Sequence, residues 1–142
     1  MTIAEQTTVA ISGHFDPFHD MHLNYIRQAL LYGDKLVCIV SSDKQLVMKK
    51  DRVNIPEAGR LEIVSLILKG LNVGTAVLNT FDTETTLVAN ALRKLRPDVF
   101  CRGGDKSPED FPKSEKSVCD QYAIEVVYAH LQENRHGSEM TL

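Results

Sequence analysis

The chain has 142 residues, of which 43% are hydrophobic and 25% are charged, and its formal net charge is −3. This length suits one domain with a full hydrophobic core, so we expect a single domain over residues 1–142. The mildly acidic balance argues against nucleic acid or a membrane as a partner. The N-terminus lacks a signal-peptide pattern, and no apolar run reaches the ~20 residues of a membrane span. We therefore expect a cytoplasmic protein.

Three cysteines, Cys38, Cys101 and Cys119, are scattered along the chain and have no metal-binding spacing. Cys38 and Cys101 lie inside apolar runs that resemble strands, which is typical of buried free thiols. No spacing of His, Cys and acidic residues indicates a metal site held by the protein alone.

Strand and helix patterns alternate from one end of the chain to the other. This alternation predicts an α/β fold with a doubly wound, five-stranded parallel sheet. Short apolar runs predict strands at residues 7–12, 36–40, 73–79, 98–101 and 124–128. Helical spacing of apolar residues predicts helices at 21–32, 57–68, 83–95 and about 115–122. The polar segment 45–54 is predicted to be a loop, 107–116 a surface excursion, and 130–142 a polar tail.

Two histidines follow the first predicted strand. His19 and His22 are three residues apart at the start of a helical pattern, so their rings should lie on one face near the helix N-terminus. The unsatisfied N–H groups and partial positive charge of that terminus suit an anion such as phosphate.

Residues 13–22 read G-H-F-D-P-F-H-D-M-H, and this segment resembles the G-x-F-D-x-x-H-x-G-H signature of the cytidylyltransferase-like nucleotidyltransferases. Met21 occupies the position of the second glycine of that signature. Residues 96–105, R-P-D-V-F-C-R-G-G-D, are similar to the R-P-D-x-x-x-K-G-G-D segment of the heptose-phosphate adenylyltransferase branch. The resemblance implies a Rossmann-like nucleotidyltransferase (HxGH) fold with strand order 3-2-1-4-5 and a homodimer.

The resemblance also implies a reaction. CMP or AMP would be transferred from CTP or ATP to a small phosphorylated alcohol or sugar, and pyrophosphate would be released. Mg²⁺ would be carried by the triphosphate. His19, His22 and Lys49 would be catalytic, because this chemistry needs positioned donors and cations around developing negative charge.

The remaining site residues follow from matching positions. The resemblance implies nucleotide contacts from the following residues: Gly13, Phe15, Asp16, Arg60, Arg102, Gly103, Gly104, Asp105, Arg135 and Ser138. Taken without the resemblance, Lys49 and Arg60 would be ordinary surface charges. Asp16 would either order its loop or hold Mg²⁺ through water, and the paired glycines would form a plain tight turn.

Two other readings of the sequence remain. The chain could be a nucleotide-binding or interaction module of the same fold with little turnover, because Met21 fills space near the nucleotide and Glu139 brings negative charge to the last motif. A scaffold unrelated to nucleotides would require both histidines to be incidental.

Overall fold

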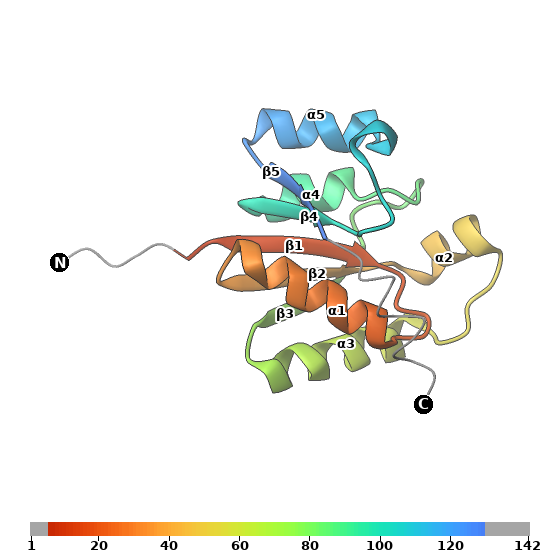
Figure 1. Cartoon of the computed structure of the whole chain (residues 1–142). Coiled ribbons are helices and arrows are strands. Elements are labelled where there is room, and N and C mark those ends of the chain that lie inside the picture. Colours follow the sequence, from red (N-terminus) through yellow and green to blue (C-terminus); the bar gives the residue numbers. More distant parts are fainter. Residues whose placement is uncertain (1–5, 130–142) are drawn as a thin grey trace.

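The computed structural model describes residues 6–129, and its centre is a five-stranded parallel sheet (Figure 1). The strands lie in the order β3-β2-β1-β4-β5, which confirms the predicted fold and strand order. Their bounds are β1 Thr8–Gly13, β2 Lys35–Val40, β3 Gly74–Leu78, β4 Val99–Arg102 and β5 Glu125–Tyr128.

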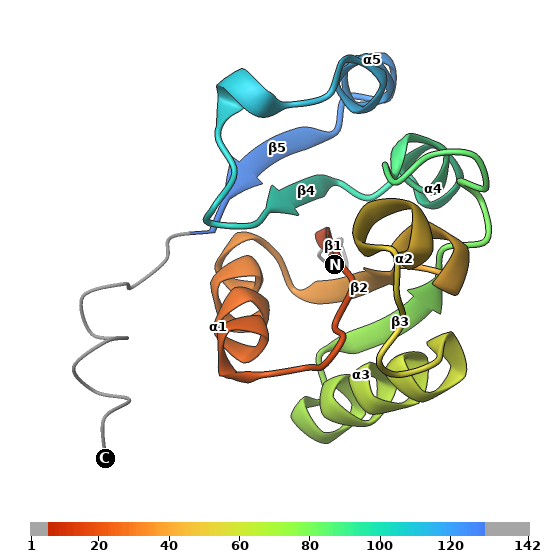
Figure 2. The same ribbon diagram turned by 90° about the vertical axis from the view of Figure 1, so that its right-hand side faces the viewer.

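Helices cover both faces of this sheet (Figure 2). α1 and α3 pack on one face, α4 and α5 pack on the other, and α2 follows β2 at the carboxyl edge. Their bounds are α1 Asp20–Ala29, α2 Asp43–Lys50, α3 Glu57–Leu71, α4 Ala89–Leu95 and α5 Lys113–Gln121, with short 3₁₀ turns at Leu30–Tyr32 and Pro108–Asp110.

The alternation of side chains along each strand divides the core into two layers. In β1, Val9 and Ile11 pack toward α1 and α3, whereas Ala10 packs toward α4 and α5. Both sets are fully buried, as expected for a central parallel strand covered on both faces. All three cysteines are free and buried, and burial raises the pKa of Cys101 to about 11. The prediction of buried thiols is confirmed for Cys38 and Cys101.

The prediction of a loop at residues 45–54 is wrong for residues 45–50, because residues 43–50 form the helix α2. The Ser42 side chain accepts from the N–H of Gln45, and the Gln45 side chain accepts from the N–H of Ser42, which is a reciprocal capping box. Asp51, in the left-handed conformation with φ 62°, ends the helix. The helix buries only Gln45 and Leu46, so its sequence shows little amphipathic periodicity.

The helix predicted at residues 83–95 begins only at Ala89, and residues 83–88 are not helical. The side-chain amide of Gln45 donates to the carbonyls of Thr85 and Leu87, which fixes this segment in an irregular path. The buried Asp82 carboxylate accepts from the N–H groups of Asn90 and Ala91 and so caps the start of α4. Tertiary hydrogen bonds therefore override the helical spacing here.

Candidate functional site

The rings of His19 and His22 lie together at the start of α1, where the sequence spacing predicts them. Their centroids are 3.9 Å apart and their planes are tilted by 22°. His19 is the N-cap residue, and its Nδ1 accepts from the N–H of Met21 at 3.2 Å. Nδ1 of His22 accepts from the N–H of His19 at 3.1 Å.

This reciprocal cap determines which nitrogen of each ring carries the proton. A neutral imidazole has one donor and one acceptor nitrogen, so an accepting Nδ1 leaves the proton on Nε2. Burial, His19, Lys50 and His14 lower the pKa of His22 to about 4, so His22 is neutral at pH 7. The two rings can therefore offer a pair of Nε2–H donors to a ligand at the N-terminus of α1.

Gly13 and Phe15 pack against this pair of histidines through the ring of His22. The ring of Phe15 is 1% exposed and meets the His22 ring edge-on, with 4.8 Å between centroids. A Cβ atom on Gly13 would lie 2.9 Å from the Phe15 ring, so a glycine is needed here for the ring to fit. The Phe15 ring belongs to the core and reaches the site through its contact with His22, and the nucleotide contacts predicted for Gly13 and Phe15 stay predictions.

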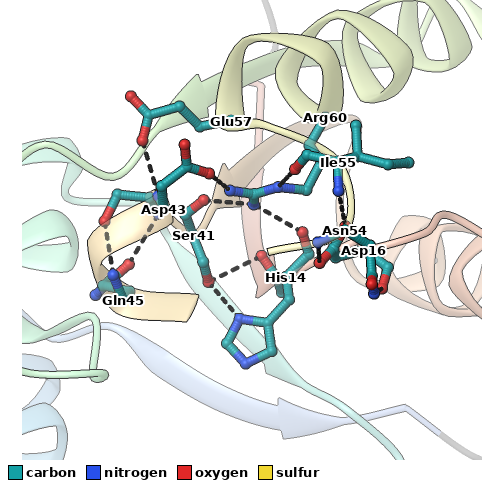
Figure 3. Close-up of polar contacts among 11 residues, drawn as sticks. His14, Asp16, Ser41, Asp43, Gln45, Asn54, Ile55, Glu57 and Arg60 are labelled. Atoms are coloured by element: carbon teal, nitrogen blue, oxygen red, sulfur yellow. Dashed lines mark hydrogen bonds and ion pairs between the residues drawn. The ribbon is translucent and has the colours of Figure 1, made fainter. Parts of the chain in front are cut away.

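Asp16 tethers the loop after β1 to the start of α3. Its Oδ2 accepts from the N–H of Asn54 at 2.8 Å and its Oδ1 from the N–H of Ile55 at 2.6 Å (Figure 3). Burial opposes the charge of Asp16, but these two donors and the charges of Arg60 and Lys50 keep its pKa below the usual value. Of the two readings of Asp16, the observed contacts match the ordering of the loop.

Arg60 is fully buried, so the interpretation of this residue as a surface charge is wrong. Its guanidinium donates to the carbonyls of Ile55, His14 and Ser41 and forms a 2.8 Å ion pair with Asp43 (Figure 3). Protein acceptors thus occupy most of its five N–H groups. Arg60 joins the ends of β1 and β2 to α2 and α3, while its predicted contact with nucleotide stays a prediction.

His14, to which the sequence analysis gives no role, lies beside this network. Its Nδ1 is 2.8 Å from Oγ of Ser41, and the same hydroxyl contacts the carbonyl of Gly13 at 3.1 Å. Burial, Lys50, Arg60 and Lys49 lower the pKa of His14 to about 4. No sequence signal pointed to this residue, because Ser41 follows a different strand and only the fold brings them together.

The predicted catalytic Lys49 and its neighbour Lys50 lie in the last turn of α2, and both are exposed. The charge of Lys50 lowers the pKa of both His14 and His22, whereas the charge of Lys49 affects only His14 of the two. The charge of Lys50 thus acts on both imidazoles, and the catalytic role predicted for Lys49 stays a prediction.

The loop after β4 reaches the same edge of the sheet, because β4 pairs with β1. Arg102 at the end of β4 is 6% exposed and forms a 2.9 Å ion pair with Asp110. It also donates to the Ser107 carbonyl and lies over the Phe111 ring. Arg102 thus anchors the loop that presents the partly exposed glycines Gly103 and Gly104 and the exposed Asp105. The nucleotide contacts predicted for these four residues stay predictions.

The comparison with known families agrees with this geometry. The family model described as cytidylyltransferase-like matches residues 10–137 of this chain. The chain belongs to the cytidylyltransferase-like family. The paired imidazoles at the start of α1 lie within the matched residues, near their N-terminal end, and membership implies nucleotidyl transfer.

Curated relatives and solved structures resemble this family member over most of its length. The bifunctional protein HldE of Hydrogenovibrio crunogenus is 35% identical over 74% of this chain, which spans 21% of that protein. The FAD synthase of Methanothrix thermoacetophila is 36% identical over 70% of this chain, which spans 64% of that protein. A lipopolysaccharide core biosynthesis protein from Thermoplasma volcanium shares the fold, with a TM-score of 0.67, 23% identity, and coverage of 88% of this chain and 97% of that one.

Met21, the departure from the family signature, fits the helix without strain. It lies in the first turn of α1 and donates its N–H to His19, so the cap survives the loss of glycine. Arg135 and Ser138, predicted from the last family motif, lie outside the described residues. Within residues 6–129, no group of three His, Cys, Asp or Glu side chains could hold a metal, and no helix is long and apolar enough to cross a membrane.

Proposed function

We propose that this protein transfers CMP or AMP from CTP or ATP to a small phosphorylated alcohol or sugar and releases pyrophosphate. The observation that carries the proposal is the reciprocal cap of His19 and His22, which occupies Nδ1 of each ring and so leaves the proton of each neutral ring on Nε2, at the N-terminus of α1. Family membership supplies the class of reaction.

In this reaction a phosphate oxygen of the acceptor attacks the α-phosphorus of the triphosphate, and the bond from that phosphorus to the bridging oxygen of pyrophosphate breaks. The chain has to orient the two phosphates and stabilise the negative charge that develops between them. The two imidazole donors and the dipole of α1 can do so without reorganisation, since the cap already fixes the rings.

Other predicted residues take complementary roles in the proposal. The ammonium groups of Lys49 and Lys50, at the end of α2, neutralise phosphate charge. Gly103, Gly104 and Asp105 seat the nucleoside, because a loop of small residues lets backbone approach a ligand closely. The loops that follow β1 and β4 lie side by side at the carboxyl edge of the sheet, which suits a ligand that bridges them.

Mg²⁺ enters this proposal with the triphosphate, where it would shield the phosphate charge. Mg²⁺ is commonly held by substrate phosphates, waters and one or two carboxylates, so a cage of protein ligands is not needed. Both carboxylate oxygens of Asp16 already accept backbone N–H groups. Asp16 can still contact a hydrated ion through its remaining lone pairs.

A screen of CTP and ATP against phosphorylated polyols and sugars, measured by pyrophosphate release, tests the proposal. We expect His22→Ala to lower turnover by on the order of 10²-fold, as the loss of one preorganised donor does. His22→Asn is the matched control, because an amide oxygen at the Nδ1 position can keep the cap while the Nε2–H donor is lost. Turnover that falls only in His22→Ala would assign the effect to the cap, and unaltered release in both variants would remove His22 from the mechanism.

A second candidate is a nucleotide-binding or interaction module with little turnover, and Met21 is the observation that favours it. Met21 lies between the two histidines in the chain, is partly buried, and carries a side chain where the family signature has glycine. Calorimetry with CTP and ATP beside the release assay separates the two functions, because binding without release favours the module. A Met21→Gly variant that gains release would identify the side chain as the obstacle.

The proposal extends to the setting of the protein. We expect a cytoplasmic homodimer whose partners are a nucleoside triphosphate and a small phosphorylated substrate, with neither nucleic acid nor a membrane involved. Sedimentation of the full chain tests the dimer.

A further inference from the structure

The hydroxyl of Ser41 determines the protonation of His14. This hydroxyl has one proton and two close neighbours, the carbonyl of Gly13 and Nδ1 of His14. The carbonyl can only accept, so a hydroxyl that donates to Gly13 must accept its hydrogen bond with His14 from Nδ1–H. With the proton on Nε2 instead, one of the two contacts would join two acceptors. Both contacts are hydrogen bonds only if Nδ1 carries the proton.

Nε2 of His14 is then left as a lone pair. Protonation of both ring nitrogens is unfavourable, because burial and the cations Lys50, Arg60 and Lys49 lower the pKa of His14. Asp16 raises this pKa, but by less. Within residues 6–129, Nε2 of His14 has no hydrogen-bond partner. Every buried side-chain nitrogen or oxygen atom in these residues does have a partner, so Nε2 is not a buried atom. Nε2 is therefore open to solvent, and Figure 3 shows it directed away from the Arg60 network.

His14 thus differs from its neighbour in what it offers a ligand. His22 presents an N–H, which suits a phosphate oxygen, whereas His14 presents an acceptor, which repels one. His14 directly precedes Phe15, whose ring meets the His22 ring with 4.8 Å between centroids, so the two imidazoles lie near each other at the end of β1. Lys50, in the last turn of α2, adds a cation near this lone pair, since its charge contributes to the lowered pKa of His14.

The strand order places the lone pair of His14 on the β2 side of β1. The His14–Ser41 bridge joins the ends of β1 and β2, whereas the Gly103 loop follows β4 on the other side of β1. If the nucleoside lies against the Gly103 loop, as the proposed function has it, the β2 side is left for the phosphorylated acceptor.

We propose that His14 is a specificity residue whose Nε2 accepts a hydrogen bond from a hydroxyl of the acceptor, while Lys50 binds the acceptor phosphate. This inference rests on the proposed function and narrows it to acceptors that carry a free hydroxyl near the phosphate. A phosphate ester without a hydroxyl leaves the lone pair unpaired and is used less well.

The test compares the most active acceptor of the screen with its deoxy analogue, for example glycerol 3-phosphate with propyl phosphate. For the wild type we expect kcat/KM to favour the hydroxylated compound on the order of 10-fold. His14→Asn can keep the bond to Ser41 through its amide but has no group at the Nε2 position, so the ratio should fall toward one. His14→Gln places an amide oxygen near that position and should restore part of the preference. A purely structural role would lower kcat/KM for both compounds equally.

Long-range ¹H–¹⁵N spectra of the imidazole rings in the full chain test the tautomers without turnover. We expect the proton on Nδ1 in His14 and on Nε2 in His22, with signals assigned by the two Asn variants. A proton on Nε2 of His14, or an unchanged acceptor ratio in His14→Asn, would overturn this inference alone. No pyrophosphate release from any pair would instead overturn the proposed function and the inference with it.

Discussion

At the residue scale, the site combines imidazoles of opposite tautomer with an exposed pair of lysines. His22 has its Nδ1 occupied by the helix cap, and His14 has its Nδ1 occupied by Ser41. Hydrogen bonds to one ring nitrogen thus decide what the other nitrogen offers. The lysines at the end of α2 are alike in sequence but differ in their effect on these rings.

We expect Lys50→Ala to reduce turnover about 10-fold or more, and Lys49→Ala to have a clearly smaller effect. The charge of Lys50 lowers the pKa of both His14 and His22, whereas that of Lys49 lowers only the pKa of His14, so we expect Lys50 to act more strongly on a phosphate bound near the two rings. Loss of one phosphate contact of this kind is worth ~1.5–3 kcal/mol. Pyrophosphate release by both variants, with folding checked by circular dichroism, measures the difference. A larger loss in Lys49→Ala would reverse the assignment.

At the element scale, the carboxyl edge of the sheet is assembled around one buried guanidinium. Arg60 on α3 binds the carbonyls of His14 and Ser41, which end β1 and β2, and the carboxylate of Asp43 on α2. Asp43 in turn donates its N–H to the side chain of Glu57 at the start of α3. The positions of α2 and of its lysines therefore depend on this network.

We expect Arg60→Lys to lower the free energy of unfolding by about 3 kcal/mol, because an ammonium cannot satisfy acceptors spread over several directions. Urea unfolding measures the loss. Arg52→Lys is the control, since Arg52 is exposed and makes no ion pair among the described residues, and it should change stability by less than about 0.5 kcal/mol. Equal stability of the two variants would contradict the role assigned to Arg60.

At the scale of the whole molecule, the sheet depends on a close approach of the backbones of β2 and β3. Gly74 begins β3 and pairs with Leu36 of β2. A Cβ atom on Gly74 would lie 1.9 Å from the Leu36 carbonyl oxygen, so a side chain there would force the strands apart. β3 is also the edge strand against which α3 packs, so the disturbance would extend to that helix.

We expect Gly74→Ala to destabilise the protein by about 3 kcal/mol or to prevent folding. Gly70→Ala is the matched control, because a Cβ atom there meets nothing within 4 Å and Gly70 lies in the last turn of α3. Alanine is favoured over glycine by ~0.5–1 kcal/mol in a helix interior, so in this last turn it should stabilise the protein by up to about that amount. Urea unfolding of both variants checks the opposite signs, and a stable Gly74→Ala protein would refute the close approach of the strands.

The sequence by itself determined the fold class, the strand order through family resemblance, and the pairing of His19 with His22. These features are local: apolar runs mark buried strands, and a spacing of three residues sets two rings on one helix face. The first motif also contains Asp16, whose role in ordering its loop was one of two readings.

Only the tertiary structure decided which polar residues hold the site together by hydrogen bonds between separate elements. Arg60 reads as a surface charge until the ends of three elements surround it, and His14 has no role until Ser41 of a different strand binds it. The start of α4 likewise depends on the distant side chain of Gln45. Hydrogen bonds between segments far apart in the chain leave no periodic trace in the sequence, so they become visible only once the sheet brings those segments together.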